Sequence, residues 1–420
     1  FFFFFFFFFC FFFFLLRQTS MRLRVWFCAW LLVSLGFAEP AFVGTASNGS
    51  LVLRPADGQQ VLIAGADFSS LLTKLDRLDK LETQLETLTQ QLAEQQCVVA
   101  ADTTSITGLS GGSFKWFGGV LAGNGKIYGI PHDSSSVLII DPATNTADTT
   151  TITGLSTGGA WIGGVLAGNG KIYGIPHHAA SVLIIDPATN TADASSITGL
   201  SVGGFKWTGG VLARDGNIYG IPYSSASVLI IDPGANTADT TTIAELSGVE
   251  KWWGGVLASN GKIYGLPYSS SSVLIIDTAT TTADTTTITG LSGNGKWCGG
   301  ALANNGKIYG TPCFSASVLI IDPSTNTVDT TTITGLRVGE AWRGEALAGN
   351  GKIYAVPFNA PSVLIIDPAT NTADTTTIAG LSGSAKWRSA VLAGNGKIYG
   401  IPSHSPSALI IQCAYVPKGL

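Results

Sequence analysis

The apolar and polar positions of this chain form a pattern that repeats seven times between residues 98 and 413. In the first copy, apolar segments at 116–122, 126–131 and 137–141 are separated by short polar stretches, and a Thr-rich segment at 147–155 follows. One tryptophan marks the same place in every copy, at intervals of 45 residues and once 46: Trp116, Trp161, Trp207, Trp252, Trp297, Trp342 and Trp387. Four strand-like segments in a period of this length are typical of a β-propeller blade. The pattern therefore predicts an all-β fold, a seven-bladed β-propeller with four-stranded blades of 45 residues.

Each segment of the repeat has residues suited to its predicted role. Asn124-Gly125, between the first two strands, favours the left-handed backbone of a two-residue type I′ hairpin turn. The segment 137–140 is apolar on both faces, as expected for a strand between two neighbouring blades. Asp141-Pro142 begins the turn into a Thr-rich outer strand, which we expect to be half exposed. Because every copy keeps its tryptophan, we assign the tryptophans to packing between blades.

The two ends of the repeat region complement each other. The last copy stops at 411–413 without an outer strand, and a spare copy of that strand stands at 101–109. We therefore expect the two ends to build the seventh blade together. The same alignment brings Cys97 and Cys413 together across the closure, where a disulfide bond would join the ends of the ring.

Cys298 and Cys313 both lie in the fifth blade. Counting outward from a two-residue turn at Asn305-Gly306 places them opposite each other at a hydrogen-bonded pair of positions, where Cα atoms are about 5.5 Å apart. This separation permits a second disulfide bond. A zinc site is the alternative use of the four cysteines.

The chain before the repeats has a different composition. Residues 1–20 begin with a run of phenylalanine, and Met21 is the only methionine, so we expect 1–20 to be a translated upstream tract. A membrane segment is the alternative, although the run is shorter than the roughly 20 apolar residues that span a bilayer. Residues 21–38 combine a basic start, an apolar centre and small residues at the end, which is typical of a signal peptide.

Residues 39–66 are predicted to be a linker in which only 51–53 and 61–63 have weak strand character. Residues 67–96 are predicted to form one amphipathic helix, in which leucines recur at intervals of three and four: Leu78, Leu81, Leu85, Leu88 and Leu92. About four heptads of this spacing favour a coiled coil and a small homo-oligomer. A single helix packed on the propeller is the alternative. Residues 414–420 form a C-terminal tail.

Composition narrows the function. Charged residues make up 12% of the chain, and the formal net charge of -4 argues against a nucleic-acid partner. The signal peptide predicts a protein that is secreted or lumenal in the secretory pathway, with no membrane span in the mature chain. The sequence contains no recognisable catalytic signature. We therefore expect no cofactor, and a binding protein more than an enzyme.

Two segments of the repeat carry a family resemblance. Lys126-Ile127-Tyr128 stands in the second predicted strand, and residues 137–145 follow the pattern Val-x-x-x-Asp-Pro-x-Thr-Asn. Over residues 98–413 this layout resembles a kelch-type seven-bladed propeller. It departs from kelch because Gly129-Ile130-Pro131 replaces the double glycine at the end of the second strand, and the glycine pair stands before the first strand instead. The resemblance implies a binding scaffold, which weakens any assignment as an enzyme.

In nearly identical repeats, function is expected at the positions that differ. The turns joining strands one to two and three to four hardly vary, and they share one face of the ring, the constant face. The segments before each repeat tryptophan and after each repeat proline vary, and they share the opposite face, the variable face. The second of these segments begins with His132-Asp133, His177-His178, Tyr223-Ser224, Tyr268-Ser269, Cys313-Phe314, Phe358-Asn359 and Ser403-His404.

Three hypotheses explain these residues. The first is a metal site formed by the four histidines, with or without Asp133; its candidates are His132, His177 and His404. It is the weakest option, because packed sheets stand about 10 Å apart and each ligand must come within about 2 Å of the ion. The second is a surface for a glycan or protein, with stacking rings from Tyr223, Tyr268, Phe314 and Phe358. The third is cross-strand packing, in which Phe117 faces His132 and Trp253 faces Tyr268.

Charged residues gather in blades six and seven. Glu345 replaces the second glycine of the inner strand, Arg343 lies two residues before it, and Arg388 is the equivalent of Arg343 in the next blade. Glu340 stands in the preceding loop. This cluster could bind an anionic ligand, and the alternative is a local salt bridge.

These observations lead to one preferred function and two alternatives. We predict a secreted, non-catalytic propeller, oligomerised through residues 67–96, that binds a glycan or protein through its variable face. The first alternative is a metal-dependent enzyme, oxidase-like or lyase-like, with a site over the central channel. The second is a structural extracellular repeat protein.

Overall fold

The computed structural model describes residues 40–45, 51–55, 61–63, 77–85, 97–109 and 112–415. The chain divides into two compact units, Cys97–Val416 and the remaining residues. The expected upstream tract and signal peptide lie outside the described residues, as does most of the expected C-terminal tail. No helix among the described residues is long and apolar enough to cross a membrane.

The segment that was expected to be a linker contains a small sheet. Strands β1 (Pro40–Thr45), β2 (Leu51–Pro55) and β3 (Val61–Ile63) pair antiparallel in the order β1-β2-β3. The two runs with strand character were recognised in the sequence, and a third run at 40–45 completes the sheet. A strand needs neighbours for its backbone hydrogen bonds, so three such runs close together in the chain pair with one another.

Part of the predicted coiled coil is described. Residues 77–85 are helical, and the rest of 67–96 lies outside the described residues. The side chains of Leu78, Leu81 and Leu85 are 55%, 52% and 66% exposed. Self-association through this helix stays a prediction.

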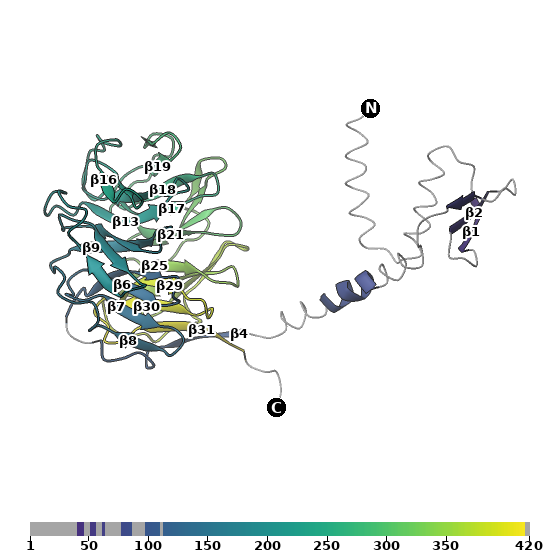
Figure 1. The fold of residues 1–420 in the computed structure, drawn as a ribbon, viewed down its shortest axis with the longest axis horizontal. Coiled ribbons are helices and arrows are strands. Elements are labelled where there is room, and N and C mark those ends of the chain that lie inside the picture. Colours follow the sequence, from purple (N-terminus) through teal and green to yellow (C-terminus); the bar gives the residue numbers. More distant parts are fainter. Residues whose placement is uncertain are drawn as a thin grey trace. The chain divides into compact units, whose positions relative to one another are not determined.

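The second unit is the predicted seven-bladed propeller (Figure 1). In the first blade, β5 (Trp116–Leu121), β6 (Ile127–Pro131), β7 (Leu138–Asp141) and β8 (Thr146–Asp148) form a four-stranded antiparallel sheet in chain order. Blades two to six repeat this arrangement. Their strands are β9 (Trp161–Leu166), β10 (Ile172–Pro176), β11 (Leu183–Asp186), β12 (Thr191–Asp193), β13 (Trp207–Leu212), β14 (Ile218–Pro222), β15 (Leu229–Asp232), β16 (Thr237–Asp239), β17 (Trp252–Leu257), β18 (Lys262–Pro267), β19 (Leu274–Asp277), β20 (Thr282–Asp284), β21 (Trp297–Leu302), β22 (Ile308–Pro312), β23 (Leu319–Asp322), β24 (Thr327–Asp329), β25 (Trp342–Leu347), β26 (Ile353–Pro357), β27 (Leu364–Asp367) and β28 (Thr372–Asp374).

The seventh blade is built from both ends of the unit, as predicted. Its order is β29 (Trp387–Leu392), β30 (Ile398–Pro402), β31 (Leu409–Tyr415) and β4 (Cys97–Asp102), and Figure 1 shows β4 beside β31. In the other blades the chain turns after the third strand, as it does after Asp141, and forms the fourth strand. In the seventh blade β31 and β4 come from opposite ends of the unit, and both continue beyond the position of this turn. Cys413 therefore pairs with Val99 and Cys97 with Tyr415, so the two cysteines are diagonal neighbours instead of direct partners. The disulfide between them stays a prediction.

The hairpin turn on the constant face differs from the predicted type I′ turn. Ala122 and Lys126 pair around a three-residue loop, and only Gly125 among its residues has a positive φ, of 79°. Asn124 is needed for its amide instead. Its Oδ1 accepts from Lys126 N at 3.1 Å, and its Nδ2 donates to Pro187 O in the next blade at 3.1 Å. The Asn-Gly dipeptide thus indicated a turn correctly, but the asparagine also ties neighbouring blades together.

The outer strand is shorter than expected. β8 ends at Asp148, and the Thr run that was predicted to be part of the strand forms bends. The Asp148 carboxylate accepts hydrogen bonds from the backbone N–H groups of Thr150 and Thr151 and from both hydroxyls. Such local side-chain bonds compete with strand pairing, which explains where the strand stops. The side chain of Ile152 then returns to the core, where it is 4% exposed.

The cores lie between neighbouring blades, as the doubly apolar third strand predicted. One cluster joins Val120 and Ile130 of the first blade to Trp161 and Leu183 of the second. The repeat tryptophans are 1–3% exposed, and each indole N–H donates to a serine carbonyl of its own blade, as in Trp116 Nε1 to Ser136 O at 2.8 Å. This confirms a packing role for these tryptophans, because a fully buried ring with its one donor satisfied offers nothing to a ligand.

The glycine pair lies inside the inner strand, not before it. In β5 a β-bulge falls between Trp116, which pairs with Pro131, and Gly119, which pairs with Gly129. A Cβ placed on Gly118 would lie 2.7 Å from Gly163 Cα in the next blade. The inner strands of these blades therefore touch through their backbones, and only glycine fits there.

Candidate functional site

A buried lysine fixes the segments of the variable face. Lys251, directly before its repeat tryptophan, donates from Nζ to Ser225 O at 2.8 Å in the preceding blade and to Gly248 O at 2.7 Å in its own blade. Its side chain is 4% exposed and lies 5.7 Å from the Trp252 ring centroid. Equivalent bonds to backbone carbonyls are made by Lys115, Lys206, Lys296 and Lys386. Five of the seven repeats carry this lysine, whereas Ala160 and Ala341 stand in the other two. The position of the lysine before a buried ring was the signal that could have revealed this role.

The variable face carries an arc of aromatic and imidazole rings over blades one to four. His132 and His177 have ring centroids 6.2 Å apart, and His177 stacks on His178 at 5.0 Å. The arc continues from His177 to Tyr223 at 6.2 Å and from Tyr223 to Tyr268 at 5.6 Å. The structure therefore brings five of the predicted site residues into one continuous surface.

Two predicted cross-strand contacts form within this arc. The Phe117 ring stacks on His132 with centroids 3.7 Å apart, and the Trp253 ring lies 5.6 Å from Tyr268. Burial is the main cause that lowers the pKa of His132 to about 3, and the charge of Arg388 adds to it. Burial also lowers the pKa of His177 to about 3. Both histidines are therefore neutral at physiological pH.

Side chains from opposite sides of the ring of blades contact one another. The Arg388 guanidinium of blade seven lies 3.4 Å from the Phe117 ring centroid, 5.3 Å from Trp253 in blade four and 5.5 Å from Phe358 in blade six. The Arg343 guanidinium lies 4.8 Å from Trp253 and 5.1 Å from Phe358. We call these five residues the axial cluster. Two of its five cation–ring contacts, those of Arg343 and Arg388 with Trp253, join blades that are not adjacent, so the sequence could not reveal them.

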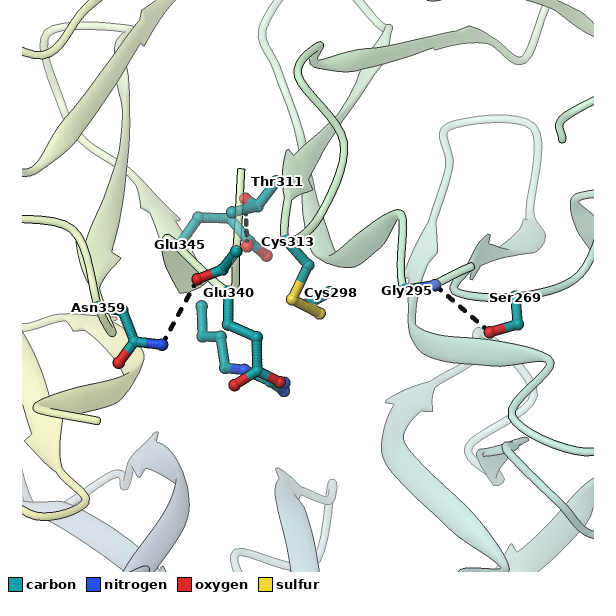
Figure 2. The surroundings of a disulfide bond; sticks show 10 residues. Ser269, Gly295, Cys298, Thr311, Cys313, Glu340, Glu345 and Asn359 are labelled. Atoms are coloured by element: carbon teal, nitrogen blue, oxygen red, sulfur yellow. Dashed lines mark hydrogen bonds and ion pairs between the residues drawn. A yellow bond between two sulfur atoms is a disulfide. The ribbon is translucent and has the colours of Figure 1, made fainter. Parts of the chain in front are cut away.

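Glu345 does not belong to the axial cluster, although the spacing placed it on the same side as Arg343. Glu345 accepts from Thr311 Oγ1 at 2.6 Å, whereas Arg343 Nη2 donates to Glu340 at 2.5 Å. A β-bulge between Trp342 and Glu345 breaks the alternation of side chains along β25, which explains the difference. Burial raises the pKa of Glu345 to about 7. Figure 2 shows Glu345 beside Thr311 and Glu340 directed elsewhere.

The predicted disulfide bond forms between Cys298 and Cys313, with Cα atoms 5.6 Å apart (Figure 2). The two residues are not a hydrogen-bonded pair, because Cys313 N donates to Lys296 O at 2.8 Å and Cys298 lies in the β-bulge between Trp297 and Gly300. In blade five the disulfide occupies the positions that Trp253 and Tyr268 hold in blade four. It therefore continues the same ring of contacts with a covalent bond.

Further contacts of the predicted residues are local. Asp133 accepts a hydrogen bond from Gly159 N in the next blade at 2.6 Å, which identifies it as a connection between blades. The His404 ring contacts Phe114 at 4.4 Å and the His178 ring contacts Phe205 at 4.5 Å. Phe314 is 45% exposed at the rim. The described residues contain no group of three or more His, Cys, Asp or Glu that could hold a metal ion, so the geometry gives His132, His177 and His404 no shared site.

The large exposed apolar side chains of the described propeller all belong to the variable face. Among its described residues, the large apolar side chains that stay exposed are Phe114 (37%), Val202 (84%), Phe205 (53%), Val249 (72%), Phe314 (45%) and Val338 (55%). Each lies in a segment before a repeat tryptophan or after a repeat proline. Exposed apolar side chains that gather on one face mark an interaction site.

Some of these side chains are displayed by a left-handed backbone. Phe114 and Phe205 have φ values of 54° and 48°, and Glu250 and Glu340 at the equivalent positions have 54° and 49°. Bulky residues rarely adopt this conformation, and such outliers gather at functional sites. The sequence showed that this segment varies, but residue type alone did not indicate a positive φ.

A cavity of about 270 Å³ lies elsewhere, on the constant side between blades two and three, where Asn169, Tyr173 and Asn236 are among its lining residues. It contains none of the predicted site residues. In other blades an asparagine accepts a hydrogen bond from the tyrosine hydroxyl, as Asn190 does from Tyr128 at 2.7 Å. At the cavity Tyr173 makes no such bond with Asn236, and its hydroxyl donates to Pro233 O instead.

The fold is shared with several solved propellers. Virginiamycin B lyase from Staphylococcus aureus is similar with a TM-score of 0.61 and 11% identity, over 76% of this chain and 100% of that one. The extracellular domain of a one component system from B. thetaiotaomicron gives 0.55 and 10%, over 90% and 47% of the two chains. Hydrazine synthase from Kuenenia stuttgartiensis gives 0.55 and 15%, over 73% and 98%. No family model and no curated protein matches the sequence. At these identities the likeness concerns the fold.

Proposed function

We propose that this protein is a secreted, non-catalytic binding propeller of kelch-like type, which recognises a glycan or a protein through its variable face. The observation that carries the proposal is the distribution of exposed apolar side chains. All six in the described propeller lie on the variable face, where water contact costs free energy that a ligand would recover. The constant face presents polar turns instead.

The aromatic arc supports the same proposal. Tyr223 is 7% exposed and Phe358 is 3% exposed, so these rings form the floor of the surface, whereas Phe205 and Phe314 stand at its rim. A floor of flat rings with a rim of exposed apolar groups suits both sugar rings and side chains of a protein. Lys251 and its equivalents hold the loops, so the segments can differ between blades without loss of the fold.

Secretion and self-association belong to this proposal. The predicted signal peptide supports secretion, and the comparison with extracellular propeller domains agrees with it. The leucines of the helix at 77–85 support a coiled coil, which would raise the strength of binding by presenting several propellers at once. A similar lyase is known among the solved structures, but the enzyme alternative has no support from a ligand cluster in the described residues.

The test compares two surface variants in a glycan array and in capture of secreted proteins. Val202→Ser combined with Val249→Ser alters the variable face at side chains that are 84% and 72% exposed. Lys171→Ser alters the constant face, at a side chain that is 44% exposed. We expect the first variant to lose the ligand that the wild-type protein binds and the second to keep it. Loss of binding in the constant-face variant alone would contradict the proposal.

A further inference from the structure

Two guanidinium groups in the axial cluster share the same pair of rings. Arg343 and Arg388 both lie within 4.8–5.5 Å of the ring centroids of Trp253 and Phe358. Contacts with common rings place the two cations close together. Like charges at such short range repel each other, and burial strengthens the repulsion because the surroundings screen it poorly.

The two cations are incompletely compensated. Arg343 Nη2 donates to Glu340, but Arg343 Nε and Nη1 and Arg388 Nε are buried without a hydrogen-bond partner. None of the ion pairs among the described residues involves Arg388. A buried donor without a partner costs about 1–3 kcal/mol, and more when it is charged. Burial and the neighbouring Arg343 lower the pKa of Arg388, which reports the same electrostatic cost.

An anion would supply the missing hydrogen-bond acceptors and also the missing negative charge. It would accept hydrogen bonds from the free N–H groups and reduce the repulsion between the guanidinium groups. The Arg343 side chain is 4% exposed, and Arg388 is half-buried as a residue although its Nε is fully buried. The cation–ring contacts leave N–H donors at the edges of the guanidinium groups without a hydrogen-bond acceptor.

The surroundings of the two arginines restrict the kind of ligand. Trp253 and Tyr268 present rings 5.6 Å apart, and Tyr223 lies 5.3 Å from Trp253. The inner strands of neighbouring blades touch, since a Cβ on Gly163 would lie 2.8 Å from Gly209 Cα. A sugar ring that stacks its C–H face on an aromatic ring, with an acidic substituent at one edge, suits a site with rings around a pair of cations.

We propose that the axial cluster binds the acidic group of an acidic saccharide, a carboxylate or sulfate held by Arg343 and Arg388 while the sugar stacks on Trp253. This inference rests on the proposed binding function and specifies its ligand class. The group makes charge-assisted hydrogen bonds with the arginines, and no covalent step is involved.

The experiment is isothermal titration of the full chain with matched oligosaccharides. Trigalacturonate is compared with its methyl ester, which removes only the charge, and a sulfated galactan oligosaccharide is compared with its desulfated form. The two pairs distinguish a carboxylate from a sulfate. We expect at least one charged form to bind about 10-fold or more tightly than its neutral counterpart, and Arg388→Gln to remove this difference.

Three controls keep the result interpretable. Arg388→Lys keeps the charge and is expected to restore part of the affinity. Arg343→Gln is combined with Glu340→Gln, so that the Glu340 carboxylate, whose side chain is 30% exposed, is not left without its partner. Lys262→Gln removes a cation of the constant face, whose ion pair with Asp277 is 3.0 Å long, and should leave binding unchanged. Circular dichroism checks that each variant is folded.

The inference is overturned if charged and neutral forms bind equally, if Arg388→Gln keeps the preference for charge, or if none of the saccharides binds. Binding of an acidic peptide without any acidic saccharide also overturns the ligand class. Should a neutral glycan or a protein bind the variable face with the same affinity in Arg388→Gln, the proposed function stands and the acidic-saccharide inference fails. The two failures are therefore distinguishable.

Discussion

Lys251→Met should destabilise the propeller although it removes no apolar contact. The ammonium donates to three backbone carbonyls, Ser225 O at 2.8 Å, Gly248 O at 2.7 Å and Tyr223 O at 3.3 Å. Methionine keeps most of the stem beside Trp252 but leaves these carbonyls without their donor. Hydrogen bonds to a charged group contribute about 1.5–3 kcal/mol each, and burial, which lowers the pKa of Lys251 to about 8, offsets part of this gain. We expect a net loss of about 2–3 kcal/mol in the free energy of unfolding.

Equilibrium denaturation in urea, followed by tryptophan fluorescence, measures this loss. Lys262→Met is the matched control, because Lys262 is in the same blade, its side chain is 41% exposed, and its ion pair is at the surface. Surface ion pairs contribute about 0–1 kcal/mol, so the control should stay close to the wild-type protein. If Lys251→Met were as stable as Lys262→Met, the reasoning that these lysines hold the variable segments would be wrong.

Three further predictions concern the rest of the chain. Reduction of the Cys298–Cys313 bond, which closes a sequence separation of 15, should lower the free energy of unfolding by up to about 3 kcal/mol in urea titrations with and without reductant, and an unchanged midpoint would speak against it. Stability should fall between pH 3.8 and about 2, because hydrogen bonds from the following hydroxyl and N–H groups lower the pKa of Asp148 and its counterparts in the folded state only. The stabilising contribution of these carboxylates is present above the unfolded pKa and is lost as the pH falls. An unfolding midpoint that does not change over this range would contradict the prediction. By light scattering, the full chain should be an oligomer and a chain lacking residues 1–96 should be a monomer. The same number of chains per particle in both proteins would refute the coiled coil.

Most of the fold could be predicted because each blade repeats the same local rules. The tryptophan interval, the apolar third strand and the missing outer strand of the last copy determined the number of blades and the closure. Details that depend on competition between bonds were missed. The Asp148 carboxylate ends its strand early, and the Asn124 amide gives a three-residue loop that also binds the next blade.

The candidate site was predicted less completely for a physical reason. Neighbours within one blade, such as Phe117 and His132, follow from counting along a hairpin. Contacts across the ring, such as Arg388 with Trp253, depend on side-chain directions that no spacing reveals. Glu345 was misplaced because a β-bulge shifts the alternation between it and Arg343.

The central claim is that ligands bind the variable face. A glycan or protein ligand is first identified with the wild-type chain. The most direct measurement is then the affinity of this ligand for two variants that carry the same change in charge. Val249→Glu lies on the variable face, where its side chain is 72% exposed, and Thr146→Glu lies on an exposed outer strand. The account predicts that Val249→Glu weakens binding and Thr146→Glu leaves it unchanged. Equal affinity of Val249→Glu and the wild-type chain, with a loss in Thr146→Glu, would contradict it.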